Sequence, residues 1–119
     1  MAKPRVDSAE GHAAVVAVNA GSSAREDVAA AVRYLLQLMS DKAPGHTVEL
    51  RVPPFGAIQC VEGPEHTRGT PPNVVEMDSP TWIALATGEL TWEAAYDSGK
   101  ISASGVRSNL SSQLPLAQW

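Results

Sequence analysis

Residues 48–61 read Val48-Glu-Leu-Arg-Val-Pro-Pro-Phe-Gly-Ala-Ile-Gln-Cys-Val61. In the first part of this run, valine and leucine alternate with glutamate and arginine, which is typical of a strand with one face in water. The Pro-Pro-Phe-Gly segment interrupts the pattern, and apolar residues resume over 57–61. We therefore predict two strands paired as a hairpin. Cys60 alternates within the second strand, which favours a small buried hydrophobe over a nucleophile.

Downstream of this hairpin, the sequence predicts two more strands, at 74–77 and 101–106, with two short helices between them. The glycine that follows each helix stands where a helix end needs a left-handed residue. Residues typical of helix ends mark both helices: Ser79, Pro80 and Gly88 for the first, and Thr91 and Gly99 for the second.

Upstream of the hairpin, the sequence predicts a long amphipathic helix that ends near Ala43, before Pro44-Gly45. Ser23-Ala24-Arg25-Glu26 has the pattern of a capping box at its start. An alanine-rich segment at 9–20 predicts a shorter helix, with a strand over 15–18 as the alternative. The apolar face of the long helix repeats with helical spacing at Val28, Val32, Leu35, Leu36 and Met39.

The order of these elements predicts an α+β fold, a mainly antiparallel sheet of four to five strands with helices packed on one face. The length of 119 residues suits a single domain over 1–119. Within it, 1–21 is an N-terminal extension or short helix, and 111–119 is a short tail.

Composition narrows the class of protein. Nine basic residues against thirteen acidic ones give a net charge of -4, which disfavours a nucleic-acid partner. The single cysteine precludes an internal disulfide and fits a reducing compartment. No run approaches the roughly 20 apolar residues of a membrane span, and the apolar run at 13–18 is short for a signal peptide. We expect a cytoplasmic protein without stable membrane insertion.

The sequence contains no catalytic constellation. The three histidines are far apart and outside metal-binding spacings, although Glu62, Glu65 and His66 together are an alternative metal set. Ser102 and Ser104 lack the first glycine of a nucleophile elbow, and no phosphate-binding loop occurs. We therefore expect no enzymatic activity, no cofactor and no metal.

The loop over 62–73 is long and rich in proline, and loops of this length tend to be functional. Its polar residues His66, Thr67 and Arg68 could converge on an anion, with the guanidinium as a bidentate donor. Two other interpretations remain open. The arginine could pin the loop by pairing with a nearby glutamate (Glu62, Glu65 or Glu76), or the loop could dock a protein partner.

Three segments carry a family resemblance. Residues 85–105 read Leu85-Ala-Thr-Gly-Glu-Leu-Thr-Trp-Glu-Ala-Ala-Tyr-Asp-Ser-Gly-Lys-Ile-Ser-Ala-Ser-Gly105 and resemble the C-terminal half of sterol carrier protein type 2 domains. The strings Val-Pro-Pro-Phe-Gly-Ala-Ile-Gln (52–59) and Gly-Pro-Glu-His-Thr-Arg-Gly-Thr-Pro-Pro-Asn-Val-Val-Glu (63–76) resemble small stand-alone relatives from high-GC Gram-positive bacteria. The resemblance spans roughly 24–116.

This resemblance implies a non-enzymatic carrier that binds a hydrophobic small molecule, a lipid or fatty-acyl compound, between sheet and helices. The same side chains could instead fill a solid core. A second hypothesis is an accessory module that binds a protein partner or an anion through the loop over 62–73. The residues expected to line a cavity are Ile58, Val75, Met77, Trp82, Leu85, Trp92 and Tyr96.

Overall fold

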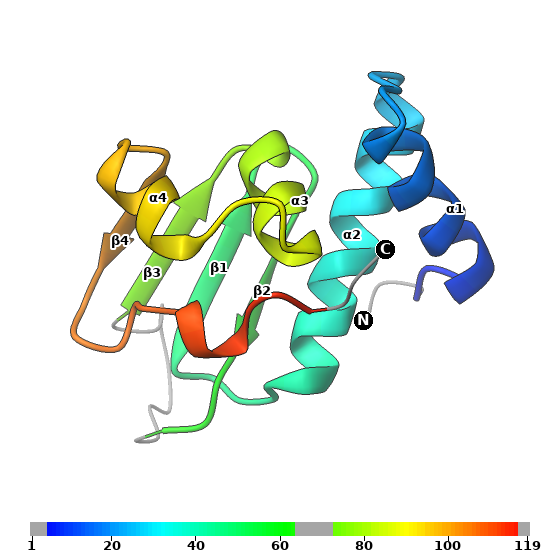
Figure 1. The fold of residues 1–119 in the computed structure, drawn as a ribbon. Coiled ribbons are helices and arrows are strands. Elements are labelled where there is room, and N and C mark those ends of the chain that lie inside the picture. Colours follow the sequence, from blue (N-terminus) through cyan, green and yellow to red (C-terminus); the bar gives the residue numbers. More distant parts are fainter. Residues whose placement is uncertain (1–4, 64–72, 117–119) are drawn as a thin grey trace.

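The computed structural model describes residues 5–63 and 73–116 (Figure 1). Helices and strands occur where the sequence patterns predict them, because each pattern reports a local periodicity. The short N-terminal segment is a helix, so the alternative strand over 15–18 is wrong. The elements in chain order are α1 (Ser8–Asn19), α2 (Arg25–Lys42), β1 (Val48–Val52), β2 (Gly56–Cys60), β3 (Asn73–Met77), α3 (Ser79–Thr87), α4 (Trp92–Asp97), β4 (Ile101–Ser104) and the 3-10 turn η1 (Ser111–Gln113).

The sheet has four strands in the order β2-β1-β3-β4. The predicted hairpin is confirmed as the antiparallel pair of β1 and β2, and β3 and β4 are also antiparallel. β1 and β3 run parallel, so the sheet is mixed. The expected sheet of four to five mainly antiparallel strands is therefore confirmed for the strand number and for the two outer pairs, but not for the central pair. Alternation along a strand specifies a buried face but not a neighbour, so the sequence pattern could not reveal this pairing.

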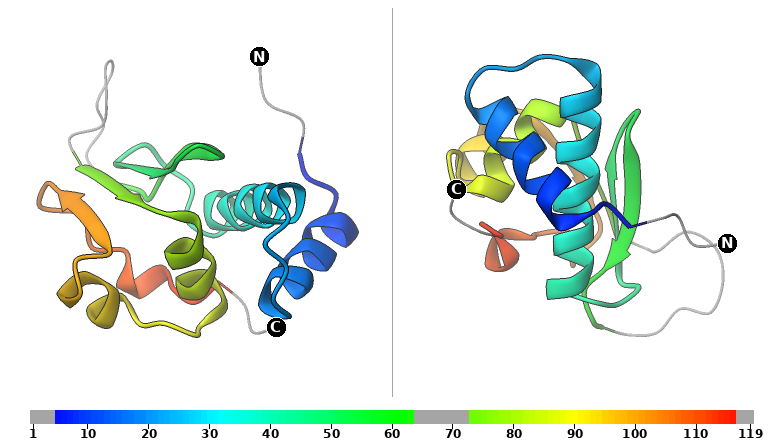
Figure 2. Two further views of the ribbon diagram at one scale, coloured as in Figure 1. Left: turned by 90° about the horizontal axis from the view of Figure 1, so that it is seen from above. Right: turned by 90° about the vertical axis from the view of Figure 1, so that its right-hand side faces the viewer.

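One face of the sheet is apolar and the other is polar. In β1 the side chains of Val48, Leu50 and Val52 are buried, whereas Glu49 and Arg51 lie on the opposite face and form an ion pair. Figure 2 (left) shows α3 and α4 on the same side of the sheet. α2 runs beside the edge strand β2, and α1 packs against α2 (Figure 1). The buried face of the sheet therefore meets the helices.

The core forms where α2, α3 and the sheet meet. Trp82 of α3 is completely buried, and its indole N–H donates a hydrogen bond to the Val32 carbonyl of α2, with a nitrogen–oxygen distance of 3.3 Å. Leu35 and Met39 of α2 and Leu50 of β1 are also fully buried. Burying a side chain of this size stabilises the fold by about 1.5–3 kcal/mol, so this cluster holds the layers together.

The predicted capping box of α2 is wrong. The helix begins at Arg25, its N-cap is Ala24, and no side chain caps it. Ser22 instead donates from its Oγ to Asp27 Oδ2 at 2.6 Å and accepts the N–H of Ala24 at 3.3 Å. The serine–carboxylate pairing is therefore built on Ser22, which precedes the cap and orders the turn leading into the helix.

The ends of α3 and α4 mostly match their predictions. Asp78, rather than Ser79, caps α3 by accepting the N–H of Thr81 at 2.9 Å. Thr91 caps α4 as predicted, accepting the N–H of Ala94. Gly88 and Gly99 have φ angles of 86° and 78°, which confirms that both helices end on a left-handed residue.

The C-terminal segment crosses from the sheet back to the helices. Lys42 Nζ, at the end of α2, donates to the carbonyl oxygens of Gln113 and Pro115 at 2.8 and 3.3 Å. The N–H of Leu116 donates to the carbonyl of Ala86 in α3 at 2.9 Å. Among the residues that the structure describes, no helix is long and apolar enough to cross a membrane.

Candidate functional site

A groove of about 220 Å³ lies between α2 and the edge strand β2. Arg33, Leu36, Gln37 and Ser40 are three or four residues apart along α2, so they share one helix face, and that face forms one wall. The opposite wall is β2 with the loop before it. Those two elements contribute Phe55, Gly56, Ala57 and Ile58, and the N-terminal segment adds Arg5 and Val6.

The N-terminal segment is held in place at one side of this α2–β2 groove. The side-chain amide of Gln37 accepts the N–H of Val6 at 2.9 Å and donates to the carbonyl of the same residue at 3.1 Å. Arg5 forms two hydrogen bonds to the carboxylate of Asp41, at 3.3 and 2.8 Å. Hydrogen bonding to Arg5 lowers the pKa of the Asp41 carboxyl. This end of the groove is therefore bounded by paired backbone and side-chain groups.

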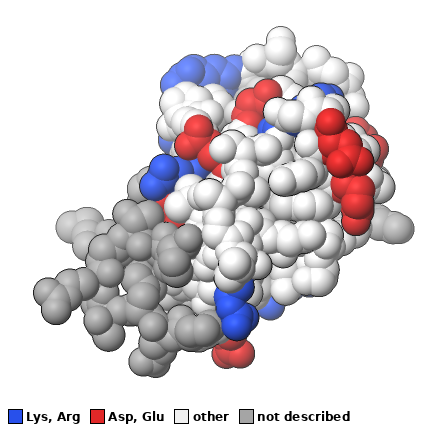
Figure 3. Space-filling model, turned by 90° about the vertical axis from the view of Figure 1, so that its left-hand side faces the viewer, with Lys and Arg blue, Asp and Glu red and all other residues white. Residues whose placement is uncertain are grey.

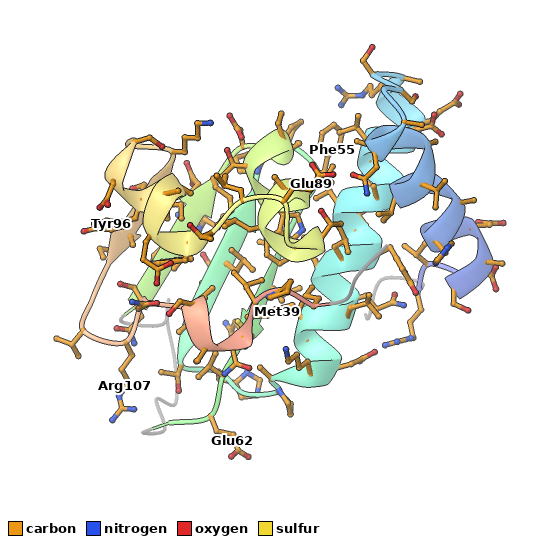
Figure 4. All side chains as sticks on the ribbon, in the orientation of Figure 1. Met39, Phe55, Glu62, Glu89, Tyr96 and Arg107 are labelled. Atoms are coloured by element: carbon orange, nitrogen blue, oxygen red, sulfur yellow. The ribbon has the colours of Figure 1, made fainter. Side chains whose placement is uncertain are left out.

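Phe55, labelled in Figure 4, lies between two arginines of α2. Arg33 donates from Nε to the carbonyl of Phe55 at 3.0 Å. The guanidinium of Arg25 lies 5.1 Å from the centroid of the phenyl ring, within the range of a cation–π contact. A second groove, of about 460 Å³, is lined by both arginines with Phe55, Glu26 and Ala29, so the two grooves share Arg33 and Phe55.

Another groove, of about 360 Å³, lies beside α4 and has a different character. Glu93 and Asp97 are one turn apart on this helix, and both line the groove with Trp92 and Tyr96. Tyr96 is 54% exposed (labelled in Figure 4). Figure 3, which views the molecule from this side, shows carboxylates gathered along one margin. The α4 groove is therefore aromatic and acidic.

A fourth groove, of about 310 Å³, lies between α4 and the C-terminal segment. Leu85 and Leu90 give it apolar side chains, and Leu114 and Pro115 close it from the other side. The tail that covers it is held by its hydrogen bonds to α2 and α3. Trp92 lines this groove as well as the α4 groove.

The structure distributes the predicted lining residues among the grooves and the core. Ile58 lines the α2–β2 groove, Leu85 lines the groove under the tail, Tyr96 lines the α4 groove, and Trp92 lines both of the last two. Val75, Met77 and Trp82 are buried in the hydrophobic core. These seven side chains thus lie at several places around one core.

The predicted polar site falls on His66, Thr67 and Arg68, which lie outside the described residues. The same holds for Glu65, one member of the alternative metal set. In the described part of the chain, no three His, Cys, Asp or Glu side chains are grouped to hold a metal ion. Cys60 is fully buried, and burial raises the pKa of its thiol to about 11, which confirms its prediction as a buried small residue.

Sequence reasoning missed the arginines around Phe55. Arg33 lies between apolar positions of α2 and is exposed. In the sequence it therefore looks like an ordinary residue on the solvent face of an amphipathic helix. One signal was available, because Phe55 is the only phenylalanine in the chain and follows two prolines in a turn. A large apolar side chain at such a position needs a partner, and α2 provides it.

Comparison with known families supports the resemblance that the sequence motifs indicate. The family model described as bacterial SCP ortholog, where SCP stands for sterol carrier protein, matches residues 24–116. The match begins just before α2 and continues through the C-terminal segment, so α1 lies outside it. No curated protein matches the chain.

Proposed function

We propose that this chain, which belongs to the family of bacterial sterol carrier protein orthologs, binds a small apolar ligand without catalysing a reaction on it. The observation that carries the proposal is the α2–β2 groove. It lies between a helix and the sheet and offers the apolar side chains of Leu36, Phe55 and Ile58. All three belong to the residues that the family model matches.

An open groove is energetically suited to a protein of this size. An enclosed empty cavity of about 300 Å³ would cost about 7 kcal/mol, at roughly 24 cal/mol per Å³. The whole stability of a domain is only about 5–15 kcal/mol. Water can occupy an open groove when no ligand is present, so the fold does not bear that cost. A ligand then gains free energy by covering apolar surface and displacing this water.

The α2–β2 groove suits an apolar chain better than the α4 groove does. In the α4 groove, a ligand would meet the carboxylates of Glu93 and Asp97. Desolvating a carboxylate is costly unless a counter-charge replaces the lost water. The α2–β2 groove has no carboxylate among its lining residues in the described part of the chain. At about 220 Å³ it accommodates roughly seven water-sized groups, so part of a longer chain would remain outside.

Two parts of the sequence-based hypothesis stay predictions. The alternative module that acts through the loop over 62–73 depends on residues outside the described part of the chain. A cytoplasmic location also remains an expectation.

Native mass spectrometry of freshly purified protein tests the proposal directly. We expect a fraction with an added mass of a few hundred daltons, which organic solvent releases as a lipid. Displacement of a neutral fluorescent acyl probe then measures affinity. Purified protein that carries no such mass and fails to bind the probe at any concentration below its aggregation limit would contradict the proposal.

A pair of tryptophan substitutions on one strand locates the site. Ile58 and Gln59 are neighbours on β2 whose side chains point to opposite faces of the sheet, and only Ile58 lines the groove. Ile58→Trp should fill the groove and weaken probe binding at least about tenfold, whereas Gln59→Trp, on the polar face, should leave it unchanged. Circular dichroism and thermal unfolding of both variants check that the fold is kept. Equal effects of the two substitutions would place the site elsewhere.

A further inference from the structure

We infer that the α2–β2 groove selects ligands with an anionic head group, and that Arg33 is the residue that binds this head group. The inference rests on the proposed function, because it concerns the chemistry of a ligand bound in the same groove. It commits to one occupant, a single apolar chain that ends in a carboxylate. Shape alone would not distinguish such a ligand from the corresponding alcohol.

Arg33 is positioned for this role by the turn before β2. Its Nε donates to the carbonyl of Phe55 at 3.0 Å, which fixes the plane of the guanidinium at the edge of the groove. Within residues 5–63 and 73–116, its two terminal nitrogens have no hydrogen-bond or ion-pair partner. A guanidinium held at Nε still presents these nitrogens as a donor pair, the geometry that matches a carboxylate.

Arg25 adds a second positive charge to the same place. It lies over the ring of Phe55, while Arg33 binds the carbonyl of that residue, so the phenylalanine separates two guanidiniums. Both arginines line the neighbouring groove, which adjoins the α2–β2 groove through Arg33 and Phe55. The apolar chain of a ligand that packs on Leu36 and Ile58 would therefore have the two guanidinium groups near one of its ends.

The charges that line the two joined grooves leave a positive excess. Arg5 is paired with Asp41, so its charge is already balanced. Glu26 is the one carboxylate among the described lining residues and balances one of the two remaining arginines. One positive charge is left to attract an anion. The α4 groove, with Glu93 and Asp97, has the opposite sign and would repel it.

Three ligands with the same chain test the inference: decanoate, decanol and decylamine. Each is titrated into the isotopically labelled protein, and the amide signals of Gly56, Ala57 and Ile58 report binding in the groove. We expect decanoate to bind about fivefold more tightly than decanol, and decylamine to bind most weakly. Raising the salt concentration should reduce the advantage of decanoate over decanol, because partly exposed charges are screened.

Arg33→Gln removes the charge and keeps a polar side chain of similar length. Arg51→Gln is the matched control, since Arg51 lies on the polar face of the sheet and pairs with Glu49. We expect Arg33→Gln to weaken decanoate about fivefold and to leave decanol unchanged, whereas Arg51→Gln should change neither. The affinity of Arg33→Lys for decanoate should lie between those of the parent protein and Arg33→Gln, because an ammonium keeps the charge but loses the donor pair.

The outcomes separate the inference from the proposed function. If decanol and decanoate bind equally, or if Arg33→Gln weakens both to the same degree, the role of Arg33 in selecting charge is overturned while apolar binding in the groove stands. If decanoate preference survives Arg33→Gln, the anion site lies on other residues and the inference is also overturned. If none of the three ligands shifts the amides of β2, both the inference and the proposed groove fail.

Discussion

Gly11 of α1 lies directly against the aromatic ring of Tyr34 in α2. A Cβ atom at position 11 would stand only 2.2 Å from Cγ of Tyr34 and 2.4 Å from Cδ1. Both residues are buried, and this contact lies within the packing of α1 on α2. Because α1 lies outside the family match, this close approach attaches an additional helix to the part of the fold that the family model covers.

The first prediction concerns this contact. In most helices, replacing glycine by alanine stabilises the protein by roughly 0.5–1 kcal/mol. Here we expect Gly11→Ala to destabilise it by about 1–3 kcal/mol, because the new methyl group overlaps the Tyr34 ring and forces the helices apart. Urea unfolding measures the loss, and hydrogen exchange of the α1 amides shows whether α1 detaches. In the background of Tyr34→Ala the penalty should largely disappear, and an unchanged penalty there would contradict the proposed clash.

The second prediction concerns Trp82, which is fully buried between α3 and α2. We expect Trp82→Ala to lower the free energy of unfolding by about 3–5 kcal/mol, as for a side chain in a solid core. Trp82→Phe should lower it less, because phenylalanine keeps most of the packing, although it loses the hydrogen bond to the Val32 carbonyl. Chemical denaturation gives both values. A loss below about 1 kcal/mol for the alanine variant, together with a several-fold change in probe affinity, would favour a cavity wall instead.

Local patterns predicted the elements of this fold well. The alternation of Val48, Leu50 and Val52 gave β1, and Thr91 gave the start of α4, because in each case the physical cause lies within a few residues. The error at α2 has the same local scale: a serine–carboxylate pair exists at the start of the helix, but it joins Ser22 to Asp27 and does not cap the helix, so the predicted capping box is wrong.

The candidate site was harder to predict because long-range packing forms it. Arg33 and Phe55 are 22 residues apart, and their hydrogen bond depends on where α2 meets the edge of the sheet. An arginine and a phenylalanine at this separation form no recognisable sequence motif. The parallel pairing of β1 with β3 has the same origin, since strand order is set by the tertiary arrangement.

The third prediction is a pH dependence centred on Cys60. Burial raises the pKa of this thiol to about 11 in the folded protein, from roughly 8.5 in an unfolded chain. The folded state therefore holds the proton more tightly. The contribution of the protonated Cys60 thiol to the free energy of unfolding is complete below about pH 8.5 and is lost as the pH rises toward 11.

Cys60→Ala isolates this contribution from the titration of other groups. The difference in unfolding free energy between the parent protein and the variant should stay constant from pH 6 to about 8.5, then fall by about 2–3 kcal/mol by about pH 11. Urea denaturation across this pH range measures the difference. A constant difference up to pH 11 would show that the thiol titrates alike in both states.

The last prediction concerns Val61, which follows β2 with a φ of 71°. A β-branched residue in this left-handed region is strained by about 1–3 kcal/mol, and the surroundings must hold it there. Its N–H donates to the Ala43 carbonyl at 2.7 Å, and its carbonyl accepts the N–H of Thr47 at 3.2 Å. Gly45 lies against it so closely that a Cβ there would stand 2.0 Å from the Val61 carbonyl oxygen.

Because glycine adopts this conformation without strain, Val61→Gly relieves a cost while it loses a half-buried side chain. We expect the two effects nearly to cancel, so that the free energy of unfolding changes by less than about 1 kcal/mol. Val52→Gly is the matched control, since Val52 ends β1 with its side chain fully buried. This substitution should lower the free energy of unfolding by about 3 kcal/mol or more. Thermal and urea unfolding of both variants give the comparison. Similar losses at the two positions would mean that the left-handed backbone at Val61 stores no strain, and that its side chain contributes as much as one in the core.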